Sequence, residues 1–107
     1  MGANSVKMYQ IPAYANSKTN MTAGTILIKA TPGRVGKLFI NTAGTAGAWA
    51  IYDVAAASAT AAANLVTSIA YGAASVAAGL SVDISYPCQN GIVVVVPTTG
   101  VAALTWQ

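Results

Sequence analysis

Hydrophobic residues along this chain occur in short runs that are β-branched or alternate with polar residues, and clusters of Gly, Pro, Asn and Thr separate the runs. Such runs are typical of β-strands joined by turns. The strands that we predict are residues 25–31, 35–41, 48–53, 65–71, 80–86, 91–97 and 101–107, and residues 6–11 are a candidate eighth strand at a sheet edge, because Pro12 ends them. Seven or eight short strands in one domain indicate an all-β fold, a β-sandwich or a jelly-roll-like barrel.

Two of these strands differ in their pattern. Residues 80–86 alternate, which predicts one buried and one solvated face, with Leu80, Val82, Ile84 and Tyr86 on the first and Ser81, Asp83 and Ser85 on the second. Residues 92–96 ("IVVVV") do not alternate. We therefore expect both of their faces to be covered, one by a second sheet and the other by a further segment or another chain.

The connections carry weaker signals. Residues 32–34 ("PGR") predict a turn in which Pro32 fixes φ and Gly33 supplies a positive φ. Residues 54–64 are rich in alanine, but an isolated helix of fewer than about 12 residues is marginal in water, so we favour a loop over a short helix. Residues 1–24 show no sustained pattern, so we expect an extended N-terminal arm at 1–24 and a β-sandwich domain at 25–107. The arm either docks on a neighbouring subunit or is a frayed terminus.

Charge is scarce in this chain. Charged residues make up 7% and hydrophobic residues 55%, whereas typical domains are about 25% charged. So little charge is unusual for a soluble monomer, which favours burial against further copies in a homo-oligomer. No run reaches the ~18 apolar residues of a membrane span and no secretory signal begins the chain, so we expect synthesis in the cytoplasm and no membrane partner.

The basic residues are confined to the first 37 positions: Lys7, Lys18, Lys29, Arg34 and Lys37. Nucleic-acid binding would need more of them, interleaved with aromatic residues as a stacking platform. We therefore expect no direct nucleic-acid contact. Docking on an acidic protein surface, or solvation of the chain's edges, explains these residues better.

The stretch "TPGRVGKLFI" (31–40) raises the possibility of a phosphate-binding loop. Such a loop has the form G-x-x-x-x-G-K-[ST] and lies between a strand and a helix. Here Gly33 and Gly36 are too close together, Leu38 stands where the hydroxyl residue is needed, and a strand follows. The stretch is therefore predicted to be a turn that leads into a strand, with no bound nucleotide.

Residues for catalysis are few. The chain has no His and no Glu, and Asp53 and Asp83 are its only acids. The absence of His rules out a Ser-His-Asp triad and an imidazole metal site, and it leaves Cys88 with no His to activate its thiol. The two aspartates could be imagined as the carboxylate pair of a glycosidase. We favour a turn position for Asp53 and a solvated strand position for Asp83. We expect no enzyme, no cofactor and no metal site.

Aromatic residues suggest a second class of function. Stacking on sugars would use Trp49, Tyr52, Tyr71, Tyr86 and Trp106 in a lectin-like module. They are spread at about one per strand, which favours a role in the core or in a subunit interface. The glycosylation sequon at Asn20 is best explained by chance, because no secretion signal accompanies it.

The register of residues 34–106 resembles that of small virion proteins of tailed bacteriophages. The matching pieces are the loop "NTAGTAG" (41–47), Tyr52-Asp53 at a strand end, and Asn90-Gly91 opening a valine-rich strand. The resemblance implies a β-sandwich without catalytic activity that decorates heads, forms head fibres or lies in tails. It predicts a capsid decoration or cement protein, located in the virion, that binds the major capsid protein or other virion proteins. A homo-oligomer is expected, with a trimer favoured by the same resemblance. A head fibre, a tail component or a carbohydrate-binding module are the alternatives.

Overall fold

The computed structural model describes residues 15–44, 48–70 and 79–107, which form eight β-strands and two single 3₁₀ turns. The strands are β1 (Asn16–Met21), β2 (Gly24–Lys29), β3 (Gly33–Thr42), β4 (Ala48–Tyr52), β5 (Leu65–Ala70), β6 (Leu80–Cys88), β7 (Ile92–Val96) and β8 (Val101–Trp106). The 3₁₀ turns, η2 (Ala57–Ala59) and η3 (Ala62–Asn64), lie between β4 and β5, so the alanine-rich segment is a loop with two short turns. The all-β prediction is confirmed.

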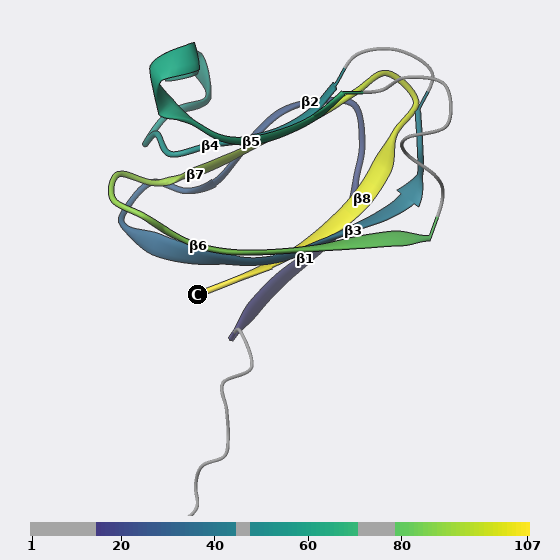
Figure 1. The fold of residues 1–107 in the computed structure, drawn as a ribbon, viewed down its shortest axis with the longest axis horizontal. Coiled ribbons are helices and arrows are strands. Elements are labelled where there is room, and N and C mark those ends of the chain that lie inside the picture. Colours follow the sequence, from purple (N-terminus) through teal and green to yellow (C-terminus); the bar gives the residue numbers. More distant parts are fainter. Residues whose placement is uncertain (1–14, 45–47, 71–78) are drawn as a thin grey trace, which may run out of the picture.

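The strands form two four-stranded antiparallel sheets that pack against each other (Figure 1). Sheet 1 has the order β1-β8-β3-β6, and sheet 2 has the order β2-β7-β4-β5. The chain changes sheet at each step between successive strands except from β4 to β5, which are neighbours in sheet 2. Because each sheet keeps two separate edges, the architecture is the sandwich and not a closed barrel.

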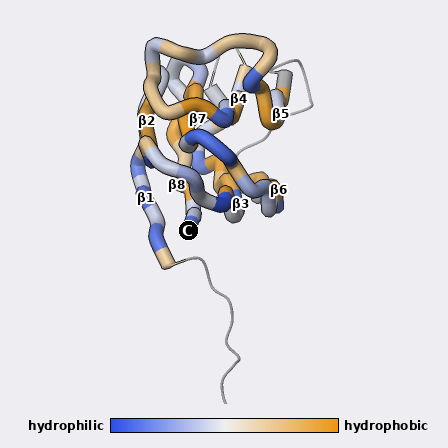
Figure 2. The backbone as a smooth tube through the Cα atoms, turned by 90° about the vertical axis from the view of Figure 1, so that its left-hand side faces the viewer, coloured by the Kyte–Doolittle hydropathy of each residue, from blue (hydrophilic) through white to orange (hydrophobic). Residues whose placement is uncertain are grey.

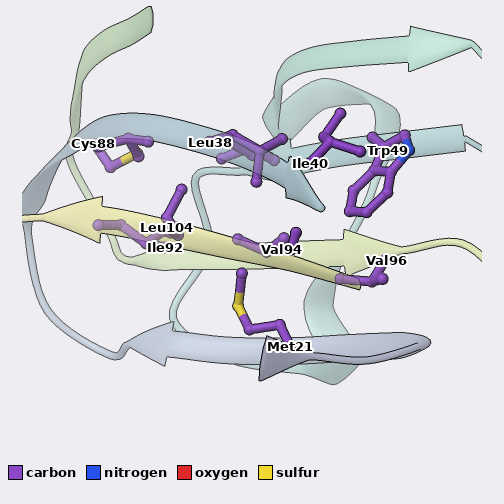
Figure 3. Packing of buried hydrophobic residues seen from close by; sticks show 12 residues of the cluster. Met21, Leu38, Ile40, Trp49, Cys88, Ile92, Val94, Val96 and Leu104 are labelled. Carbon is purple, nitrogen blue, oxygen red and sulfur yellow. The ribbon is translucent and has the colours of Figure 1, made fainter. Parts of the chain in front are cut away.

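The hydrophobic core lies between the sheets and uses one face of each (Figure 3). Sheet 1 contributes Leu38, Ile40 and Leu104, and sheet 2 contributes Trp49 and Ile51, none of them more than 1% exposed. Successive residues of a strand point to opposite faces, so the spacing of two between Leu38 and Ile40 and between Trp49 and Ile51 directs each pair inward. Burial of each large aliphatic side chain stabilises the fold by about 1.5–3 kcal/mol.

The valine-rich strand β7 is covered on both faces, as predicted. Ile92, Val94 and Val96 belong to the core cluster, whereas Val93 is fully buried and lies outside that cluster. The loop between β4 and β5 provides this cover. It begins at β4, which is one neighbour of β7, and its turn η2 packs beside β2, which is the other neighbour, so the loop crosses over β7. The 3₁₀ turns stand on the face of sheet 2 that is turned away from sheet 1 (Figure 1). The cover is thus part of the same chain, and β7 no longer gives a reason to expect an oligomer.

The N-terminal boundary differs from the prediction. Residues Asn16–Met21, expected in the arm, form β1 and pair antiparallel with β8. Met21 is 1% exposed and belongs to the core. Every other residue of β1 is exposed, so a single buried side chain gave no periodic signal. This part of the predicted arm belongs to the sandwich. Residues 1–14, including the candidate strand at 6–11, lie outside the described residues.

Two local predictions also need correction. Gly33 lies inside β3 and is not among the residues with positive φ. Its lack of a side chain matters for another reason, since a Cβ atom there would lie 2.6 Å from the carbonyl oxygen of Gln107. In β6 the predicted alternation holds from Ser81 to Ile84, but Leu80, expected on the buried face, is 36% exposed. Ser85 has φ of 47° where the register shifts, and Tyr86 is 45% exposed. A β-bulge therefore interrupts the pattern of this strand.

Candidate functional site

The most elaborate polar cluster of the described residues surrounds Asp53, directly after β4. Its Oδ1 accepts hydrogen bonds from the backbone N–H groups of Asn90 (2.7 Å) and Gly91 (3.3 Å), and its Oδ2 accepts one from the N–H of Gln89 (2.9 Å). These donors form the turn between β6 and β7. One carboxylate thus ties the end of β4 to a turn 36 or more residues later in the chain.

Asp53 also closes the loop that covers Val93. Its backbone N–H donates to the carbonyl of Asn64 at 2.8 Å, which brings the two ends of the alanine-rich loop together. Gly91 packs directly against the backbone of this loop and of β2, because a Cβ atom at Gly91 would overlap the carbonyl oxygens of Val54 and Lys29. Asp53 and Gly91 therefore join three segments of sheet 2 and its cover.

The hydrogen bonds decide the ionisation of Asp53. Burial acts to raise the pKa of this carboxyl, but the three backbone N–H groups and the Asn90 side chain lower it, and the net pKa lies below the ordinary 3.8. Hydrogen bonds to the charged form favour that form. Asp53 is therefore an ionised acceptor at neutral pH, occupied by its own chain, and this arrangement suits a structural anchor and not a proton donor.

Cys88 is 3% exposed at the end of β6 and belongs to the core cluster. Burial and the nearby charge of Asp53 raise the pKa of its thiol to about 11. Because the thiolate is the reactive form, the side chain acts as a small core residue near neutral pH. It is the last residue of strand β6.

The two aspartates are associated with different sheets. Asp83 lies in sheet 1 and is exposed, and its Oδ1 accepts a hydrogen bond of 2.6 Å from the hydroxyl of Ser85. It stands directly opposite Lys37 on β3. Asp53 follows a strand of sheet 2 and is held by the 89–91 turn.

The segment 31–40 leads into a strand, as predicted, but the strand begins at Gly33 and includes two residues that were expected in the turn. Gly36 is buried inside β3, and the strand continues to Thr42 with no helix after it. Arg34 donates from Nη2 to the carbonyl of Ser85 at 3.2 Å, and its backbone N–H donates to the carbonyl of Gln107 at 2.9 Å. Arg34 thus links β3 to β6 through its side chain and to the residue after β8 through its backbone.

The aromatic residues do not share one face. Trp49 is buried in the core and donates from Nε1 to the carbonyl of Ala43 at 3.3 Å. Trp106 is partly buried against the core, while Tyr86 on the edge strand β6 is exposed. Tyr52 lies on sheet 2, and Tyr71 lies outside the described residues.

Exposed apolar side chains were not foreseen from the sequence. Leu27 and Leu65 are 44% and 42% exposed, and pairing places them in one cross-strand row with Val93 and Tyr52 on the outer face of sheet 2. Hydrophobic residues dominate β2, β7 and β5, whereas β1 is mostly hydrophilic (Figure 2). The pattern of β2 gave a signal for this, because "ILI" (26–28) leaves one apolar side chain on the outer face.

Within the described residues no pocket is detected, and no three His, Cys, Asp or Glu side chains gather where they would hold a metal. No helix in this part of the chain has the length and apolarity needed to cross a membrane. Comparisons of the chain with family models, with curated proteins and with solved structures gave no match.

Proposed function

We propose that this chain is a non-enzymatic structural protein of a tailed-bacteriophage virion, and that it binds the head shell as a decoration or cement protein. The observation that carries this proposal is the position of the motifs behind the resemblance. Tyr52 ends β4 and Asp53 follows it, the alanine-rich loop comes next, and Asn90-Gly91 precedes the valine-rich β7. The resemblance implies this order of strands and loops.

Two of these motifs form one physical unit. Asp53 of the Tyr-Asp motif accepts hydrogen bonds from the N–H groups of Asn90 and Gly91 of the Asn-Gly motif. Their common presence is thus explained by a structural link between two strand ends of sheet 2. The Asp53 carboxylate thus holds the fold together, which is compatible with a protein whose function is to bind other proteins through its surface.

The surface supports the same proposal. Outer positions of the sheets carry small, hydroxyl or apolar residues with few charges, which suits contacts repeated many times in a symmetric shell. A decoration protein stabilises the particle through many such contacts. Each copy bridges shell subunits, and the binding free energies of all the copies add to the stability of the shell. The resemblance favours the head; a fibre or a tail position is the alternative within the same class.

A binding experiment with particle parts tests this proposal. Purified chain is mixed with separated heads and tails that lack it, and each fraction is sedimented and quantified. We expect saturable binding to heads, in a fixed ratio to the major capsid protein, and a higher temperature of DNA release from the decorated heads. Binding to tails alone would assign the protein to the tail, and binding to neither would overturn the proposal.

A further inference from the structure

The edges of the two sheets differ in how they are protected from pairing with another chain. An open sandwich has four edge strands, here β1 and β6 in sheet 1 and β2 and β5 in sheet 2. An edge strand exposes unpaired backbone N–H and C=O groups, which form a template for a further strand. Natural proteins block such edges with charges, bulges, Pro, Gly or a covering segment.

Three of the four edges carry such features. In β1, Lys18 is followed by Asn20 with a positive φ and by a register shift. In β6, Asp83 and Pro87 flank the bulge at Ser85. In β2, a register shift precedes Lys29. The turn η2 also packs beside β2.

The fourth edge, β5, has none of these blocking residues. Its sequence, "LVTSIA", contains no charge, no Pro and no Gly. Its one irregularity is the register shift at Val66 near its start, which leaves residues 67–70 in regular register with β4. Among the described strands, β5 has a neighbour on one side only.

The distribution of basic residues favours pairing of this edge with a second copy of the same chain. The chain carries a net charge of +3, so two copies repel each other wherever their basic residues meet. The described basic residues lie on β1, β2 and β3. Of the four edge strands, β5 and β6 contain no basic residue, but β6 carries Asp83 and lies beside β3 with its two basic residues. Lys29 is on β2 at the far edge of sheet 2 from β5. Two copies therefore meet with the least repulsion at β5.

We propose that β5 is a self-association edge, at which the β5 strands of two copies pair antiparallel across a two-fold axis. The two sheets then continue as one, and each strand meets an identical uncharged strand, as a symmetric contact requires. This replaces the trimer that the resemblance favoured with a two-fold contact. It concerns the free protein and does not depend on the proposed location in the virion.

A charge-swap experiment tests the two-fold contact. Ser68 is exposed and lies within the regular part of β5, so Ser68→Lys places like charges near one another across the axis. Like charges that face each other across strands are destabilising, and we expect Ser68→Lys and Ser68→Asp each to weaken dimerisation by about tenfold in sedimentation equilibrium. A mixture of the two variants should regain association as a heterodimer. The matched control is Ser81→Lys, an exposed serine on the edge strand β6, which should dimerise like the unaltered chain.

Hydrogen exchange of the unaltered chain gives a second readout that no variant can distort. We expect the β5 amides to become more protected as the concentration rises through the dimerisation range, while β6 amides stay constant. A monomer throughout the micromolar range would overturn the inference. It would also fail if a dimer or trimer persisted in both Ser68 variants, or if only β6 amides gained protection.

Discussion

Substitution of Asp53 should destabilise the sandwich far more than its position beside a surface loop suggests. The carboxylate accepts three backbone hydrogen bonds from the 89–91 turn, and a hydrogen bond to a charged group contributes about 1.5–3 kcal/mol. In Asp53→Asn one oxygen remains, and it can still accept from Asn90 and Gly91. The new NH₂ group then faces the N–H of Gln89, and two donors cannot bond to each other.

We therefore expect Asp53→Asn to lower the free energy of unfolding by about 2 kcal/mol, because the charge and one acceptor are lost. For a domain of this size, that corresponds to a fall in Tm of about 10 °C. Asp83→Asn is the matched control. Asp83 is exposed and bonds to the Ser85 hydroxyl, so its substitution should change stability by no more than about 0.5 kcal/mol.

The effect should depend on pH with a defined sign. The folded-state pKa of Asp53 lies below the ordinary 3.8, so the charged carboxylate contributes stability above that pH and loses it as the pH falls through the folded-state pKa. The difference in unfolding free energy between the unaltered chain and Asp53→Asn should be constant near neutral pH and shrink in acid. Urea unfolding followed by tryptophan fluorescence measures it. Equal stability of the two chains at pH 7, or an equal loss in Asp83→Asn, would refute the anchoring role.

Other substitutions test the core and the segments joined to it. Gly91→Ala should lower the free energy of unfolding by about 2 kcal/mol or more, because the new methyl group overlaps backbone atoms of Val54 and Lys29 that no change of rotamer can move. An unchanged Tm would contradict this packing. Cys88 should react with iodoacetamide in the folded chain at least about a hundredfold more slowly than in urea, because burial raises its pKa from 9.0 to about 11; equal rates would show that the thiol is accessible. Met21→Ala should lower the free energy of unfolding by about 2–5 kcal/mol. A chain that begins at Ala23 lacks β1 and should lose cooperative unfolding, and full stability of this truncated chain would exclude β1 from the domain.

Most strands could be predicted from the sequence, because their burial follows the hydrophobic pattern. In β7, for example, Ile92, Val94 and Val96 face the core and Val93 faces the loop, so an unbroken apolar run correctly predicted two covered faces. Which segment covers Val93 was not predictable, since that depends on the path of a loop made mainly of alanine. Alanine carries almost no signal about which strand it packs against.

The elements that were missed have in common a weak local signal. β1 buries Met21 and exposes its other residues, so its place in sheet 1 comes from pairing with β8 at the far end of the chain. The role of Asp53 was likewise hidden, because its partners begin at Gln89 and are mainly backbone N–H groups, which every residue except proline supplies. The sequence indicated that Asp53 and Asn90-Gly91 are turn residues. It did not indicate that they meet.

Quantitative mass spectrometry of purified particles tests the proposed virion role most directly. Particles are purified from a lysate of cells that produce this chain from its native genome, and peptides of the chain are measured against those of the major capsid protein. We predict that the chain co-purifies with intact particles through successive density gradients, at many copies per particle and in a constant ratio to the capsid protein. A chain that stays in the soluble fraction, or whose ratio to the capsid protein falls with each gradient, would contradict the proposal that it is a structural part of the virion.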